Sequence, residues 1–181
     1  MNFIAHAPEH ELVDHLTAVA QGAAAAVDTA SAPWAHLAGL WHDLGKFRPG
    51  FQSYVRQDDE AHIEGRGVVG RDKTHSAAGA VHALQTLKQR FGEPGRQVGW
   101  LLAHLIAAHH AGLYDAAELQ ERLIGGTRAD SEREHQEAVA ACASHAPELL
   151  ALPEALDAKA LLPGIPGLRE REPLAQSLWL R

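Results

Sequence analysis

The chain has 181 residues, of which 46% are apolar and 22% charged, so it can form one domain with a real core and is too apolar for wholesale disorder. A net charge of −7 argues against a broad basic surface for duplex nucleic acid, and no apolar run approaches the ~20 residues of a membrane span. The single cysteine, Cys142, excludes a disulfide framework, and acidic residues replace the basic start of a signal peptide, so we expect a cytoplasmic protein.

Helical periodicity runs through the first half of the sequence. Residues 9–28 carry apolar side chains at helical spacing. Ser31 is a candidate N-cap for a second helix that reaches about Gly45, and FQSYVRQ (51–57) predicts a short third helix. Residues 58–74 are polar and rich in glycine, which predicts a long loop.

The second half continues in the same way. Thr74 is placed to cap a helix over residues 75–90, and Pro94 opens another that should end at Gly112. The stretch Asp115-Ala-Ala-Glu118 resembles a capping box for a helix over 116–124. A further amphipathic helix is expected over 131–145, so the sequence predicts an all-α fold.

The last 25 residues differ from the rest. A Pro/Gly-broken connector over 157–173 leads into PLAQSLWLR, which begins as a helix but carries no glycine, asparagine or proline stop signal. Eight or nine residues form only a marginal helix on their own. We therefore expect a single helical bundle over 1–156, and a connector plus a truncated helix over 157–181.

Histidine is the residue type in excess, with thirteen copies. WHDLGKF (41–47) sets His42 and Asp43 side by side in an apolar helical run, where a carboxylate needs a hydrogen-bonded partner or a metal ion. Adjacent helical residues lie ~100° apart, so both can converge on one site only near the edge of a face. Four predicted helices offer imidazoles to the interior: His15, His42, His75 and the doublet His109–His110.

Each residue taken singly also has a plain structural reading. A core histidine is more often hydrogen-bonded than ligating, and Lys46 near a helix end complements the helix dipole without any catalytic role. Only the joint pattern H…HD…H…HH indicates a metal centre, because a helix bundle gains nothing structurally from it. Most of the histidines in terminal, loop or polar contexts are expected to be solvated (His6, His10, His62, His135, His145). Three others share helices with the candidates and either support the ligands or simply pack beside them (His36, His82, His104).

The order HDLGK, DKTHSAAGA and AAHHAGL resembles the HD nuclease domain of the type I CRISPR-associated nuclease-helicase, with HELVDHLTAVA matching its first ligand helix. The match covers roughly residues 9–115. The HD pair by itself indicates only the wider HD phosphohydrolase superfamily, and the HHAG doublet makes the nuclease branch more specific. The resemblance implies a helical domain that holds two divalent transition-metal ions and cuts single-stranded DNA in CRISPR antiviral defence.

The resemblance also implies roles for individual residues. Asp43 would bridge both ions, and Lys46 matches the motif lysine expected near the scissile phosphate. The family pattern expects one more aspartate on a late helix, for which Asp115 and Asp157 are the nearest substitutes, so the first ion should bind more weakly than the second. The implied ligands are His15, His42 and Asp43 for the first ion, and Asp43, His75, His109 and His110 for the second.

The chemistry of this ligand set agrees with phosphodiester hydrolysis. Two ions ~3.5–4 Å apart can activate water, neutralise the phosphate and assist the leaving oxygen. Imidazole-rich donors favour Fe, Mn, Co or Ni over Mg.

The expected partners are single-stranded DNA, a helicase module (fused downstream or separate) and a CRISPR surveillance complex, with no membrane. Four cations in or beside the 58–74 loop either line a DNA groove or belong to a mixed-charge loop: Arg56, Arg66, Arg71 and Lys73.

Two other functions stay open at this point. An HD-type phosphohydrolase of nucleotides or cyclic nucleotides also uses H…HD…D ligands, although the HHAG doublet favours the nuclease. A metal-bound docking module without catalysis is the alternative outside enzymes. Retention of His42, Asp43 and Lys46 argues against it, because a scaffold needs neither the ligands nor the lysine.

Overall fold

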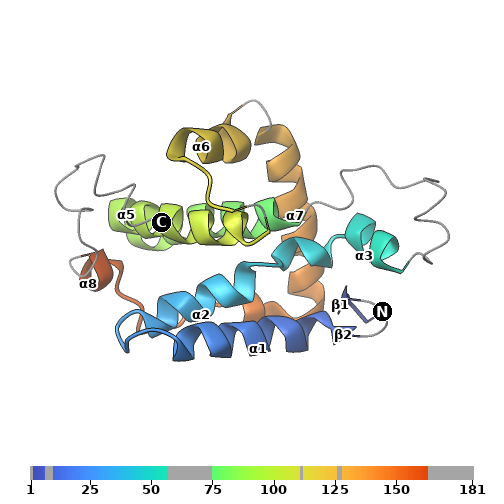
Figure 1. Cartoon of the computed structure of the whole chain (residues 1–181), viewed down its shortest axis with the longest axis horizontal. Helices are drawn as coiled ribbons and strands as arrows, with labels where there is room; N and C mark the ends of the chain where they lie inside the picture. Colours follow the sequence, from blue (N-terminus) through green and yellow to red (C-terminus); the bar gives the residue numbers. More distant parts are fainter. Residues whose placement is uncertain (1, 7–9, 57–74, 111, 126–127, 163–181) are drawn as a thin grey trace.

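Helices dominate the computed structural model, which describes residues 2–6, 10–56, 75–110, 112–125 and 128–162 (Figure 1). The all-α prediction is confirmed, and none of the described helices is long and apolar enough to cross a membrane. The helices are α1 (Leu12–Ala25), α2 (Ala32–Trp41), α3 (Pro49–Val55), α5 (Ser76–Ala108), α6 (Ala116–Ile124), α7 (Arg128–His145) and α8 (Ala158–Leu161), with the 3₁₀ helices η1 (Leu44–Phe47) and η3 (Pro147–Leu150).

A small antiparallel hairpin precedes α1 and was not predicted. It pairs β1 (Ile4–His6) with β2 (His10–Glu11) and sets His6 opposite His10. Strands of two and three residues are too short to show an alternating pattern. The buried side chain of Gln52 holds β1 in place: its Oε1 accepts from the Ile4 N–H at 3.0 Å, and its Nε2 donates to the Ile4 carbonyl at 2.9 Å.

The turn between α1 and α2 is organised by Asp28 rather than by Ser31. Ser31 stands at the N-cap position but makes no capping bond, so the predicted cap is wrong. Its hydroxyl donates instead to Asp28 Oδ2 at 2.8 Å, while Asp28 Oδ1 accepts from the backbone N–H groups of Ala30 and Ser31. This turn returns the chain so that α2 packs along α1 (Figure 1).

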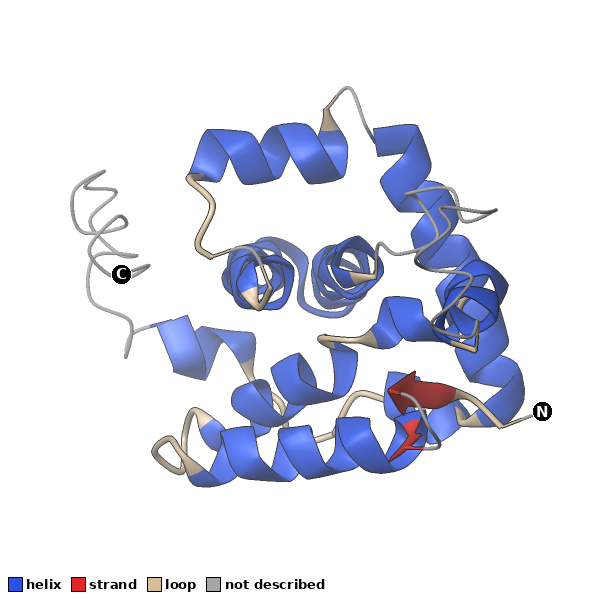
Figure 2. Ribbon diagram, turned by 45° about the vertical axis from the view of Figure 1, so that its right-hand side comes forward, coloured by secondary structure: helices blue, strands red, loops and turns tan. Residues whose placement is uncertain are grey.

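The two helices predicted over 75–90 and 94–112 form the two halves of α5. They are joined at Gly92, whose φ of 65° is the left-handed conformation that glycine adopts at low cost. Figure 2 shows the halves end-on and side by side. A Cβ on Gly95 would lie 1.9 Å from the Leu87 carbonyl oxygen, so glycine permits this close packing.

The end of α2 is buried in the hydrophobic core. Trp41 is fully buried, and its indole N–H donates to the Leu149 carbonyl at 2.9 Å. Burial of such a side chain contributes about 1.5–3 kcal/mol. Asp43, two residues further on, therefore follows one of the most tightly held positions in the fold.

The connector expected from residue 157 begins with an ordered helix. Asp157 caps α8 by accepting from the N–H groups of Lys159 and Ala160, and Ala158 and Leu161 are buried in the main core. The capping box at Asp115 is confirmed, since Glu118 N–H donates to Asp115 Oδ1 at 2.8 Å. Both aspartates considered as substitute ligands are thus occupied as helix caps. Residues 163–181 and Thr74 lie outside the described residues.

His82 and His135 form a half-buried to buried pair between α5 and α7, so the expectation that His135 is solvated is wrong. His82 Nδ1 lies 3.3 Å from His135 Nε2, and the His82 ring packs edge-on against Trp41. Burial, with a smaller effect from His135, lowers the pKa of His82 to about 3. Burial also lowers the pKa of His135, against the opposing charge of Glu132.

We expect the free energy of unfolding to fall as the pH drops from 7 to 5. The folded-state pKa of His82 lies below its ordinary value of 6.5, so the unfolded chain binds the extra proton first. The stabilisation is complete above pH 6.5 and is lost as the pH falls below it, by about 2 kcal/mol at pH 5 for His82 alone. Urea unfolding of wild type and His82→Gln at both pH values measures this difference.

The control is His36→Gln, which removes a histidine on α2 that belongs to neither the His82–His135 pair nor the cluster around Asp43. His82→Gln should show a weaker loss of stability at pH 5 than either wild type or this control. An equal loss in all three chains would mean that other groups cause the acid sensitivity.

Candidate metal centre

Asp43 lies where helix α2 has just ended. The prediction that this helix reaches Gly45 is wrong: α2 stops at Trp41, His42 is its C-cap, and Asp43 has φ −111° and ψ 21°. The chain then turns into η1. Because the pair straddles a helix end, His42 and Asp43 do not have to share a helix face, and His42 Nε2 lies 3.1 Å from Asp43 Oδ2.

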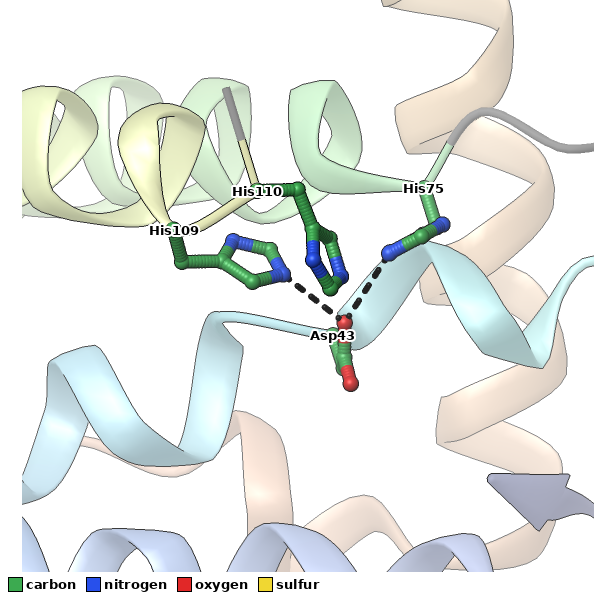
Figure 3. Close-up of side chains that lie close together, drawn as sticks. All are labelled: Asp43, His75, His109 and His110. Carbon is green, nitrogen blue, oxygen red and sulfur yellow. Dashed lines mark hydrogen bonds and ion pairs between the residues drawn. The ribbon is translucent and has the colours of Figure 1, made fainter. Parts of the chain in front are cut away.

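The buried carboxylate of Asp43 divides its two oxygens between two sets of imidazoles. Oδ2 lies 3.1 Å from the Nε2 atoms of both His15 and His42. Oδ1 lies 3.3 Å from His75 Nε2 and 3.2 Å from His109 Nε2. Figure 3 shows the Oδ1 side, with His75 and His109 directed at the carboxylate. Five of the six ligands expected from the sequence therefore lie together around this carboxylate.

His110 completes the group on the Oδ1 side. Its ring projects into the space between His75 and His109 (Figure 3), with ring centroids 4.9 Å from His75 and 4.0 Å from His109. Potential ligand atoms of Asp43, His75, His109 and His110 all lie within 4.8 Å of one another, and the same holds for His15, His42 and Asp43. Asp43 belongs to both groups.

A helix end also creates the second doublet. Helix α5 stops at Ala108 and His109 is its C-cap, although Gly112 was expected to mark the end. Gly112 has a φ of 80° and its N–H donates to the Ala108 carbonyl at 3.0 Å, which is typical of a left-handed helix stop. Both histidines therefore lie between the end of α5 and the stop at Gly112, and each has a ring nitrogen within 4.8 Å of an Asp43 oxygen.

Backbone carbonyls orient two of the imidazoles. His42 Nδ1 lies 2.7 Å from the Gly39 carbonyl oxygen, and His109 Nδ1 lies 2.6 Å from that of Ile106. A carbonyl only accepts, so each Nδ1 carries the hydrogen and each neutral ring directs the lone pair of Nε2 at the carboxylate. Lone pairs 3.1–3.2 Å from a carboxylate oxygen repel it unless a proton or a metal ion lies between. The residues present therefore fit a divalent cation.

The charges around Asp43 favour its ionised form. Burial by itself would raise the pKa of Asp43, but hydrogen bonds from His109 and His42 and the charges of His42 and Lys46 hold it well below its usual range. Burial, the largest single effect, would lower the pKa of His109. The hydrogen bonds to Asp43 and to the Ile106 carbonyl, together with the charge of Asp43, outweigh it and raise the pKa. A proton on His109 Nε2 and a metal ion thus compete for the same position.

Lys46 is buried next to the carboxylate. Its ammonium group lies 2.8 Å from Asp43 Oδ2 and donates to the Ala5 carbonyl at 3.3 Å, and only 2% of the residue is exposed. Lys46 therefore serves as a counter-ion for Asp43 and ties strand β1 to the centre. Its expected place near a scissile phosphate stays a prediction.

Among the described residues, Arg56 and the histidines of the N-terminal hairpin lie outside the two groups around Asp43. Arg56 donates to the carbonyl and side-chain oxygens of Gln52 and to the Asn2 carbonyl, so it braces the N-terminal segment. His62, Arg66, Arg71 and Lys73 lie outside the described residues. His6 and His10 are exposed, as expected, but they gather beside His15. No sequence signal indicated this, because the hairpin that carries them has no periodicity.

Gly45 determines how closely His75 approaches Asp43. A Cβ on Gly45 would lie 2.2 Å from the His75 carbonyl oxygen and 2.6 Å from its Cα, both backbone atoms that cannot move alone. Gly45→Ala should therefore displace His75 and lower metal occupancy on the Oδ1 side, measured by equilibrium dialysis. The matched control is Gly22→Ala on α1, where a Cβ meets nothing within 4 Å and metal binding should not change. Unaltered occupancy in Gly45→Ala would exclude this positioning role.

The comparisons with known proteins agree with this geometry. The family model described as "Cas3, HD domain" matches residues 4–175, which is most of the chain, while no curated protein matches the sequence. Members of this family are HD-type metal-dependent phosphohydrolases associated with CRISPR systems, and the histidine clusters around the buried Asp43 are able to hold a divalent metal. The chain belongs to the family of Cas3 HD domains.

Proposed function

We propose that this domain is a nuclease that hydrolyses phosphodiester bonds of single-stranded DNA with two divalent transition-metal ions. One observation carries the proposal: the two oxygens of the buried Asp43 carboxylate face separate imidazole sets, with His15 and His42 on Oδ2 and His75 and His109 on Oδ1. A carboxylate shared in this way is the arrangement expected of a bridging ligand.

The residues of the chain would have distinct tasks. Asp43 would bridge the two positions, while the carbonyls of Gly39 and Ile106 hold the rings of His42 and His109 with Nε2 directed inward. When bound, two such ions activate a water molecule, neutralise charge on the phosphate and stabilise the leaving oxygen. Lys46 fixes the carboxylate and adds a positive charge near the reacting phosphate.

The types of ligand atom indicate which metals this site prefers. Five imidazoles and one carboxylate favour Fe, Mn, Co or Ni over Mg, which prefers oxygen ligands. The proposed catalytic core extends past the expected boundary at residue 156 and includes α8, because Ala158 and Leu161 are buried in the main hydrophobic core. The proposed partners are a helicase module that supplies single strands and a CRISPR surveillance complex, in keeping with the family.

We expect the domain to degrade single-stranded DNA in Mn²⁺, Co²⁺ or Ni²⁺ and to leave blunt duplex largely intact. The net charge of −7 disfavours a phosphate-tracking duplex surface, whereas a single strand needs only local contacts at the metal centre. Gel assays with one labelled strand, alone or annealed, measure the difference. Efficient cutting of relaxed blunt duplex by this chain would overturn the substrate assignment.

The same assay separates the alternatives. A panel of nucleotides and cyclic nucleotides, tested with the same metals, should show little turnover. Rapid nucleotide hydrolysis without DNA cleavage would assign the chain to nucleotide phosphohydrolysis. Metal binding without hydrolysis of either substrate class would favour a docking module.

A further inference from the structure

A third group of histidines lies beside the centre just described. It consists of His6 in β1, His10 in β2 and His15 in α1, and their potential ligand nitrogens all lie within 4.8 Å of one another. The His15 ring stands edge-on to both partners, with ring centroids 5.2 Å from His6 and 5.5 Å from His10. Neither Asp43 nor His42 belongs to this group.

The strand that carries His6 is fixed from several directions. The Ala5 carbonyl accepts from Lys46 Nζ, and both backbone polar groups of Ile4 bond to the buried Gln52 side chain. The Leu12 N–H donates to the Phe3 carbonyl at 2.9 Å, which joins the strand to the start of α1. Because strand pairing sets His6 opposite His10, the fold presents these imidazoles together next to His15.

We propose that His6, His10 and His15 form a third metal position, an all-imidazole site for Zn²⁺, Ni²⁺ or Co²⁺. Neutral imidazoles suit these cations, whereas Mg²⁺ and Ca²⁺ require oxygen donors. Three histidines with a remaining open position are a known arrangement for zinc. His6 and His10 are exposed, so solvent can complete the coordination and ions can exchange freely.

The proposed third metal position and the proposed first metal position share one ligand, His15. His15 Nε2 lies 3.2 Å from His42 Nε2 and 3.1 Å from Asp43 Oδ2, so the same residue belongs to both groups. The proposal goes beyond the proposed function, since it requires neither Asp43 nor hydrolysis of a phosphodiester. A test therefore has to weaken the Asp43 positions while leaving His15 in place.

Zinc binding to the full chain carrying Asp43→Asn provides this test. Equilibrium dialysis against Zn²⁺ counts the ions bound with and without the additional changes His6→Gln and His10→Gln. We expect the two glutamines to remove one bound ion, or to weaken its binding at least tenfold, whereas His36→Gln in the same background changes nothing. Circular dichroism confirms that each chain is folded; if Asp43→Asn fails to fold, His42→Gln replaces it as the background.

One result of this zinc titration would contradict the proposal. Identical zinc stoichiometry and affinity with and without His6 and His10 would overturn the third position. That outcome would not contradict the proposed nuclease function, because nuclease activity is tested separately by substitution of Asp43 in the otherwise unaltered chain. Conversely, loss of the zinc ion in the glutamine variants would stand even if the chain cut no DNA.

Discussion

Asp43→Asn should reduce nuclease activity by roughly a thousandfold or more and lower metal occupancy on both sides of the carboxylate. Asparagine keeps the size of the side chain but removes the negative charge and one acceptor oxygen. Because Oδ1 and Oδ2 each face two imidazoles, this single change affects both proposed positions. Single-turnover cleavage of labelled DNA and metal analysis of the purified variant measure the two effects.

Two comparisons make the result specific. Asp14→Asn changes an exposed aspartate next to His15 in sequence and should leave activity and occupancy unaltered. His75→Ala or His110→Ala should empty chiefly the Oδ1 side, since neither residue belongs to the group with His15 and His42. Full occupancy of both positions in Asp43→Asn would disprove the shared-ligand arrangement.

Removal of metal should lower the melting temperature markedly. The proposed ligands come from α1, the end of α2, the start of α5 and its end, so a bound ion ties together segments distant in the sequence. An ion present at 100 times its Kd stabilises the folded state by about 2.7 kcal/mol. For a chain of this size that corresponds to roughly 5–10 °C per ion. Differential scanning calorimetry before and after dialysis against a chelator measures the shift.

Re-addition of metal supplies the control for chelation. Mn²⁺ or Co²⁺ should restore the original melting temperature, and Mg²⁺ should restore little of it, because the donors are mainly imidazoles. The shift should also be smaller in Asp43→Asn, in which both positions are weakened. A melting temperature that does not respond to chelation would show that the folded state is independent of bound metal.

The sequence by itself determined the helical fold and the residues that gather at the centre. Apolar spacing marked the positions of α1 and α7, since a helix that buries one face must repeat its apolar residues every three or four positions. The capping box at Asp115 marked the start of α6. The motifs HDLGK and AAHHAGL, with His15 and His75, identified Asp43 and the five histidines that lie around it. These signals are local, so they can be read without knowledge of the packing.

Only the tertiary structure decided how these residues meet. Helices α2 and α5 each end directly before a doublet, where ring-to-carbonyl hydrogen bonds and core packing compete with continued helix. The approach of His75 depends on Gly45, and the burial of Lys46 depends on strand β1. His6 and His10 reach His15 through a hairpin held by Gln52, which lies 48 positions after Ile4, the strand residue that it bonds. Such contacts arise from packing between distant segments, and no periodicity within either segment encodes them.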